Sequence, residues 1–183
     1  MGKLIVISGP SGVGKGTIVK KLLKTGGYAL SVSCTTRAPR DGEKEGVSYF
    51  FITEKKFDEM IENGGFLEYS RHFGKSYGTP KSFVEKQLKT HDVILEIEVD
   101  GALQVKKSYP EAVLIMVVPP NARELKARLL KRGSEDEDTI QKRMQRMEYE
   151  LSKRGQYDYT VVNDKLEAAV DEINGIIKSV DKK

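Results

Sequence analysis

The segment from Leu4 to Lys24 places a glycine-rich loop between two regular elements, and no other feature constrains the fold as strongly. The apolar run Leu4–Ile7 predicts a buried strand, and Lys15–Lys24 carries its apolar residues on one helical face. Between them stands Gly9-Pro10-Ser11-Gly12-Val13-Gly14-Lys15-Gly16-Thr17, a G-x-x-x-x-G-K loop. Glycines let backbone N–H groups curl around phosphate oxygens, and the following helix adds positive potential. We therefore expect this loop to bind the phosphates of a nucleoside triphosphate, with Lys15 over the transferred phosphate.

The position after the lysine departs from the usual loop. A Ser or Thr that binds Mg²⁺ normally follows the lysine, but here Gly16 does and Thr17 comes next. Two interpretations stay open: Thr17 is a shifted ligand, or Mg²⁺ is held mostly by water and phosphates.

The rest of the chain alternates apolar runs with helical patterns. Further short apolar runs, bounded by polar or turn residues, predict the strands Val93–Ile97, Val113–Val118 and Tyr159–Val162. Helical patterns cover Pro80–Lys89, Gly101–Ser108, Ala122–Lys131, Asp136–Arg154 and Lys165–Val180. This alternation predicts an α/β fold with a parallel sheet between layers of helices.

One region breaks the alternation. Ser31–Tyr77 has the pattern of short strands and turns around a single helix, Glu54–Asn63, and predicts a small mixed β insertion. The polar segment Arg132–Asp138 is a candidate lid. We expect a single domain, 1–183, with a core of residues 1–30, 80–127 and 156–183, the insertion at 31–79 and the lid region at about 128–155.

Charge and cysteine content narrow the partners. The chain has 31 Lys and Arg against 27 Asp and Glu, and the two signs are interleaved over most of its length. Anionic small molecules explain this surplus, and neither a nucleic acid nor a membrane is expected as a partner. The single cysteine, Cys34, excludes an intramolecular disulfide and favours a reducing compartment, so we expect a cytoplasmic protein.

Several motifs, taken in order, carry a family resemblance. The phosphate loop is followed by SCTTRAPRDGEKEGVSYFF, GFLEYSRHFGKSYGTP, ILEIEVDGA, KRG and VVND. From about Ile5 to about Asp164 the chain resembles guanylate kinases, which are P-loop nucleoside monophosphate kinases. The resemblance implies a P-loop core, a GMP-binding insertion and a lid that closes over ATP. It also implies Mg²⁺ as cofactor and the reaction of ATP with GMP to ADP and GDP, with dGMP as a second expected acceptor.

The acceptor phosphate has four candidate ligands. Arg37 and Arg40 lie three apart in a loop stiffened by Pro39, and two guanidinium groups can hold one phosphate dianion. Tyr49 and Tyr77 offer phenolic donors, which the resemblance assigns to the same phosphate.

The acceptor base has a candidate reader in Glu68, which lies in an otherwise apolar stretch. An ionised carboxylate only accepts hydrogen bonds, so it matches the adjacent N1–H and 2-amino donors of guanine and opposes the N1 acceptor of adenine. The resemblance places Ser33 and Thr79 at the O6 and N7 edge of the purine. Thr79 could also cap a helix that has Pro80 in its first position.

Acidic residues alternate in the strand-like run that contains Glu96 and Glu98. At the end of a strand, these carboxylates could serve hydrated Mg²⁺ or the guanine amino group, and the resemblance supports acidic residues at both positions. We expect Glu98 in the GMP site and Glu96, with Thr17, near the metal. The role of Asp100 stays open.

Arginines of the lid region and one asparagine complete the expected site. Arg128, Arg132 and Arg143 are expected to stabilise the charge of the moving phosphoryl group after closure. Asn163 matches the VND motif that the family places near adenine, although it could also cap the helix that follows.

Two other functions remain as alternatives. The first is a kinase of the same fold that acts on AMP, dTMP or a phosphorylated sugar. The second is a non-catalytic protein-binding module, which the intact phosphate loop disfavours. The sequence leaves the oligomeric state open between a monomer and a homodimer.

Overall fold

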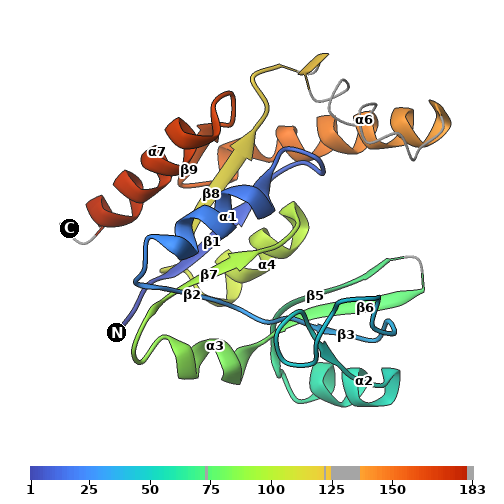
Figure 1. The fold of residues 1–183 in the computed structure, drawn as a ribbon. Coiled ribbons are helices and arrows are strands. Elements are labelled where there is room, and N and C mark those ends of the chain that lie inside the picture. The colour runs from blue at the N-terminus through green and yellow to red at the C-terminus, as the bar shows by residue number, and fades with distance from the viewer. Residues whose placement is uncertain (73, 122, 125–136, 181–183) are drawn as a thin grey trace.

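The computed structural model describes residues 1–72, 74–121, 123–124 and 137–180, which form two sheets and the helices around them (Figure 1). The larger sheet is five-stranded and entirely parallel. Its strands, in spatial order, are β2 (Tyr28–Leu30), β7 (Asp92–Glu96), β1 (Leu4–Ser8), β8 (Val113–Val118) and β9 (Tyr159–Val162). This sheet confirms the predicted α/β class.

The order of the strands fixes where a ligand can bind. The chain builds outward from β1 on one side with β7 and β2, and on the other side with β8 and β9. In such open parallel sheets, the crevice lies beyond the carboxyl ends of the strands where the winding direction changes. The phosphate loop leaves β1 at that point.

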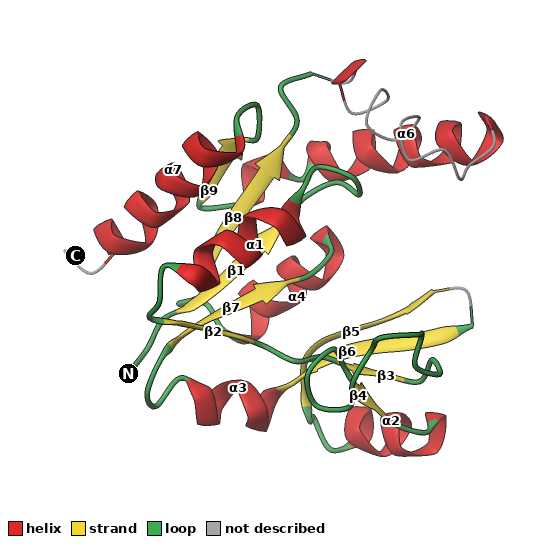
Figure 2. Ribbon diagram, viewed as in Figure 1, coloured by secondary structure: helices red, strands yellow, loops and turns green. Residues whose placement is uncertain are grey.

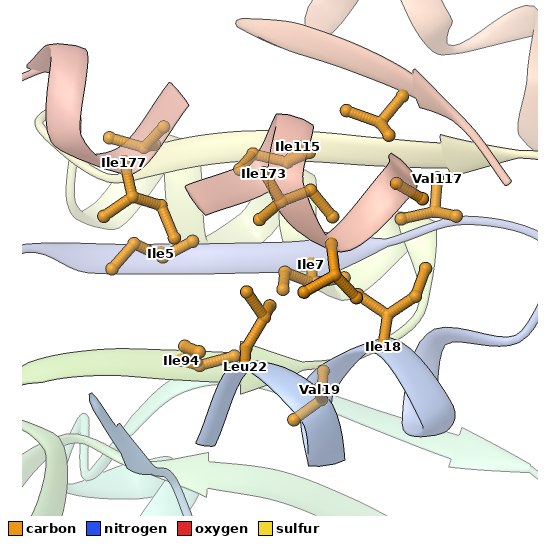
Figure 3. Packing of buried hydrophobic residues seen from close by; sticks show 14 of the residues in the cluster. Ile5, Ile7, Ile18, Val19, Leu22, Ile94, Ile115, Val117, Ile173 and Ile177 are labelled. Atoms are coloured by element: carbon orange, nitrogen blue, oxygen red, sulfur yellow. The ribbon is translucent and has the colours of Figure 1, made fainter. Parts of the chain in front are cut away.

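Helices cover both faces of the parallel sheet (Figure 2). On one face, α1 (Lys15–Lys24) and α7 (Leu166–Ser179) pack on side chains of β1, β7 and β8. Figure 3 shows Leu22 of α1 beside Ile94, and Ile177 of α7 beside Ile5. On the other face, α3 (Lys81–Gln87) and α4 (Val99–Ser108) pack through Val84, Leu88, Ala102 and Val105. Burial on both faces explains why these strands are apolar without alternation.

The smaller sheet has four strands in the order β4 (Phe50–Phe51), β3 (Cys34–Thr35), β6 (Lys75–Pro80) and β5 (Phe66–His72). It is mixed, because β3 and β4 pair in parallel while the other pairs are antiparallel. The helix α2 (Glu54–Glu62) packs on it through Phe57, whose ring centroid lies 4.5 Å from that of Phe66. Burial raises the pKa of the Cys34 thiol in β3 to about 11, so this cysteine acts as a packing residue.

The remaining described elements are α6 (Glu137–Ser152) and the short 3-10 helix η1 (Arg154–Gln156). The predicted helix Ala122–Lys131 and most of the predicted lid, Arg132–Asp138, lie outside the described residues. Within the described part of the chain, no helix combines the length and apolar character needed to span a membrane.

Some of the expected helix and strand boundaries differ from those in the structure. Pro80 is the N-cap of α3 rather than its first residue, and no side chain caps that helix. Glu98 lies outside β7, which ends at Glu96, and is instead the N-cap residue of α4. The strand β2 was not predicted, because its three residues are only partly buried and carry little pattern.

Candidate active site

The phosphate loop is fixed by backbone contacts that only glycine permits. Gly9 has φ 142°, and a Cβ there would lie 2.1 Å from the carbonyl oxygen of Val117 in β8. Gly14 has φ 100°, and a Cβ there would lie 2.7 Å from Nδ2 of Asn163. The same Nδ2 donates to the carbonyl of Val13 at 2.8 Å, so the buried Asn163 side chain holds the loop from the end of β9.

Lys15, the first residue of α1, folds back over the loop. Its Nζ donates to the carbonyls of Gly9 at 2.5 Å and Pro10 at 3.1 Å. Burial lowers the pKa of this ammonium group, while the neighbouring carboxylates of Glu96, Glu150 and Glu98 oppose that shift. A loop that accepts anions with its N–H groups therefore also presents a cation at its centre.

A cleft of about 490 Å³ opens above this loop. Its lining residues are Gly9, Ser11, Gly12, Gly14, Lys15, Gly16, Thr17, Lys20, Glu96, Ile97, Glu98 and Glu150. We call it the donor cleft. It brings together the predicted loop residues except Pro10 and Val13, the latter of which is buried in the core. It adds Lys20 and Glu150, which sequence reasoning missed.

The carboxylate of Glu96 fits a role beside hydrated Mg²⁺. A Cβ on Gly16 would lie 3.3 Å from Oε1 of Glu96, so the missing side chain leaves the space between this carboxylate and the loop open. Partial removal from water raises the pKa of Glu96, and Lys15 lowers it again. Among the described residues, no group of three or more acidic, His or Cys side chains forms a metal cage. Mg²⁺ is commonly bound with few protein ligands, so a hydrated ion held by Thr17 and Glu96 would fit this site.

A second and larger cleft, of about 870 Å³, lies between the smaller sheet and the segment that follows β7. Its lining residues are Ser33, Arg37, Arg40, Tyr49, Glu68, Ser70, Lys75, Tyr77, Gly78, Glu96, Ile97, Glu98, Asp100, Gly101 and Arg146. We call it the acceptor cleft. Glu96, Ile97 and Glu98 line both clefts, so the two spaces meet at the carboxyl end of β7.

Glu68 presents a buried carboxylate to the acceptor cleft. Its side chain is 6% exposed, and its Oε1 accepts a hydrogen bond of 2.6 Å from the Thr79 hydroxyl. Burial raises the pKa of Glu68, and the bonds from Thr79 lower it. Its Oε2 lies toward α4, where a Cβ on Gly101 would approach to 2.7 Å. Thr79 is thus a hydrogen-bond partner of Glu68. The alternative that Thr79 caps α3 is wrong, because Pro80 is the N-cap residue of that helix.

Arg37 is held in a bidentate pair that the sequence did not reveal. Its two terminal nitrogens donate to the Glu43 carboxylate at 3.0 and 2.9 Å, and the backbone N–H of Arg40 donates to the same carboxylate at 2.8 Å. The guanidinium carbon of Arg37 also lies 5.6 Å from the centroid of the Tyr49 ring, which meets Tyr77 edge-on. These neighbours raise the pKa of Arg37 and lower that of Glu43, so both stay charged.

Only one of the three arginines expected in the lid region lies within the described residues. Arg128 and Arg132 lie outside the described residues, and Arg143 belongs to α6. On the same helix, the structure places Arg146 in the acceptor cleft, where it meets Asp100 at 2.6 Å. Neither the arginine nor its pairing was predicted, because Arg146 lies in no motif and its partner is 46 residues away.

A phosphate loop on a parallel core, with a second polar cleft meeting it at the end of β7, defines a P-loop nucleoside monophosphate kinase. Residues 1–180 match the family model described as guanylate kinase. The chain therefore belongs to the guanylate kinase family.

Individual relatives agree with this assignment. The chain is 49% identical to the guanylate kinase of Clostridium tetani over 179 residues, covering 97% of this chain and 86% of that protein. It is 51% identical to the guanylate kinase of Clostridioides difficile over 180 residues, covering 97% and 88%. The crystal structure of guanylate kinase from Anaplasma phagocytophilum matches with a TM-score of 0.77 and 33% identity, covering 97% of this chain and 85% of that one.

Proposed function

We propose that this chain phosphorylates GMP to GDP with ATP by direct in-line transfer, and that dGMP is a second acceptor. One observation carries the proposal: the donor and acceptor clefts meet along Glu96, Ile97 and Glu98. A phosphate held by the loop and a phosphate held by the acceptor cleft can then face each other in line. Membership of the guanylate kinase family makes ATP and GMP the two substrates.

Selection of guanine rests on Glu68. An ionised carboxylate pairs with the N1–H and 2-amino donors of guanine, whereas adenine would oppose it with an acceptor at N1. Because Glu68 is buried, a mismatched base leaves it unpaired at a high cost. Glu98 is proposed to add a contact to the 2-amino group, and Ser33 to serve the O6 and N7 edge. Thr79, expected at the same edge, is buried, does not line the acceptor cleft and donates its hydroxyl proton to Glu68, so its proposed role is to hold that carboxylate.

The acceptor phosphate is proposed to bind Arg37, Arg40, Tyr49 and Tyr77. In the structure, Glu43 occupies the bidentate face of Arg37, so a dianionic phosphate must share or replace that carboxylate. Glu43 therefore keeps Arg37 oriented between substrate encounters.

Transfer itself is proposed to rely on positioning and on stabilisation of charge. The acceptor phosphate is already an anion near neutral pH, so the step needs no strong general base. Lys15, with Arg128, Arg132 and Arg143 after closure, would stabilise the charge that spreads over the moving phosphoryl group. Mg²⁺, bound with ATP near Thr17 and Glu96, would neutralise part of the charge of the donor phosphates. Asn163 would lie near the adenine while it supports the loop through Val13.

The place of action and the assembly are also proposals. The single cysteine, Cys34, accords with a reducing cytoplasm. One chain supplies both clefts, which is sufficient for a monomer.

An acceptor panel tests the proposal. ADP formation would be measured with ATP and Mg²⁺ against GMP, dGMP, AMP, CMP, UMP and dTMP. We expect turnover with GMP and dGMP alone. Turnover with AMP or dTMP would overturn the role of Glu68, and ATP binding without any acceptor turnover would overturn the enzymatic function.

A further inference from the structure

A cluster of charged side chains ties α6 to the first turn of α4. Arg146 donates from Nη2 to Oδ2 of Asp100 at 2.6 Å and from Nε to Oε1 of Glu150 at 3.1 Å. The hydroxyl of Tyr149 donates to Oδ1 of Asp100 at 2.9 Å. Asp100 therefore accepts from two residues of α6, and both of its oxygens are used.

This cluster reaches into both clefts. Arg146 and Asp100 line the acceptor cleft, and Glu150 lines the donor cleft. The Nη2 of Arg146 also lies 3.9 Å from Oε2 of Glu98, which lines both. The Arg146 guanidinium group thus lies beside three carboxylates: Asp100 of the acceptor cleft, Glu150 of the donor cleft, and Glu98, which lines both.

The charges explain why a cation is needed at this point. Glu98, Asp100 and Glu150 gather where two polyanionic nucleotides are expected to meet. Glu150 is only 4% exposed, and its Oε2 has no hydrogen-bond partner in the part of the chain that the structure describes. A buried carboxylate of this kind depends on its paired cation, and Arg146 is its bonded partner on Oε1.

We propose that Arg146 is a positioning residue for phosphoryl transfer, anchored by Asp100, that holds α6 on α4 and orients Glu98 and Glu150 at the junction of the clefts. The proposal rests on the function given above, because it assigns the two clefts to GMP and ATP. The residue acts through its neighbours and needs no contact with the reacting atoms.

Kinetics of four variants test the proposal. Arg146→Ala should raise the KM for GMP by about tenfold or more, with a smaller effect on kcat, because the misplaced groups act mainly on nucleotide binding. Arg146→Lys keeps the charge without the planar fork and should fall between the wild type and Arg146→Ala. Asp100→Asn should change the KM in the same direction. The double variant Asp100→Asn/Arg146→Ala should be no worse than Arg146→Ala alone, because the two residues act as one unit.

Arg154→Ala is the matched control. Arg154 is exposed in η1, just beyond the end of α6, and its Nε donates to the Thr160 hydroxyl. This variant removes the same side chain and should leave the KM for GMP within about twofold of the wild type. Equal KM values for Arg146→Ala and Arg154→Ala would overturn the proposed positioning role.

Hydrogen exchange supplies a readout without substrate. Exchange of the α6 amides should be faster in Arg146→Ala than in Arg154→Ala, because the anchor to Asp100 is lost. A wild type without GMP turnover would refute the proposed function, while the exchange data would still decide the anchoring. Unchanged exchange of the α6 amides in Arg146→Ala would refute the proposed anchoring of α6 by Asp100. If Arg146→Ala does not fold, the same measurements on Arg146→Lys and Asp100→Asn test the proposal.

Discussion

Glu68 is the buried carboxylate that we propose selects the base. Thr79 holds its Oε1, and the side chain faces a cleft that also receives Arg37 and Tyr77. Glu68→Gln keeps the shape but replaces an acceptor oxygen with a donor NH₂, which opposes the donors of guanine. We expect kcat/KM for GMP to fall by about 10²-fold or more, because a donor is left unpaired in a buried site.

Steady-state kinetics with GMP check this prediction, and Glu62→Gln is the control. Glu62 is an exposed carboxyl at the end of α2, so its substitution removes the same charge away from the clefts. Unchanged use of GMP by Glu68→Gln would refute the assignment of the base site.

At the scale of single residues, the sequence was most informative where a motif imposes chemistry. The glycines of the phosphate loop, Lys15 and Glu68 were all recognised, and the structure places them in the two clefts. Glu43 was not predicted, because its bidentate pair with Arg37 depends on a loop conformation rather than on a pattern.

Elements bring these residues together, and α4 illustrates how closely. Gly101 lies in its first turn, where a Cβ would approach Oε2 of Glu68 to 2.7 Å. Gly101→Ala should therefore displace the Glu68 carboxylate, and the higher helix propensity of Ala partly offsets the cost of this shift in stability. We expect a KM for GMP raised by about tenfold, with an unfolding free energy within about 1 kcal/mol of the wild type.

Gly175→Ala is the matched variant in α7, because a Cβ there meets nothing within 4 Å. It should raise the unfolding free energy by about 0.5–1 kcal/mol and leave the KM for GMP unchanged. Chemical denaturation and kinetics on both variants separate the two effects. A Gly101→Ala enzyme with normal GMP affinity would show that the position of Glu68 is not constrained from α4.

The elements that the sequence predicted well are those with long apolar runs. β1, β8 and α7 were expected almost as observed, since burial on a whole face leaves a strong periodic or continuous signal. The strand β6 (Lys75–Pro80) was not predicted, because it contains Gly78 and Pro80 and takes its register from β5 and β3. The contact of α6 with α4 was equally hidden, since it joins residues distant in the sequence.

Several carboxyl groups around the two clefts of the molecule are partly removed from water, which disfavours their ionised form. Burial raises the pKa of Glu68, Glu96 and Glu150 above the ordinary value of 4.5. An acid whose folded pKa is raised stabilises the fold fully below its unfolded pKa, and this contribution is lost as the pH rises through the folded pKa. These carboxylates therefore lower the stability of the fold at neutral pH, which is consistent with a proposed role in binding rather than in folding.

Glu68→Gln isolates one such contribution, because glutamine does not titrate. The unfolding free energy of the wild type, relative to this variant, should decrease as the pH rises from about 4.5 through the raised pKa of Glu68, and then level off. Glu54 supplies a control of opposite sign, since hydrogen bonds from Thr36 and Ser76 lower its pKa. Relative to Glu54→Gln, the wild type should lose stability as the pH falls. Urea denaturation of the three proteins between about pH 2.5 and 8 measures both slopes, because the Glu54 contribution is lost below about pH 4.5 and the Glu68 contribution above it. Slopes of the same sign would contradict the burial of Glu68 as the cause.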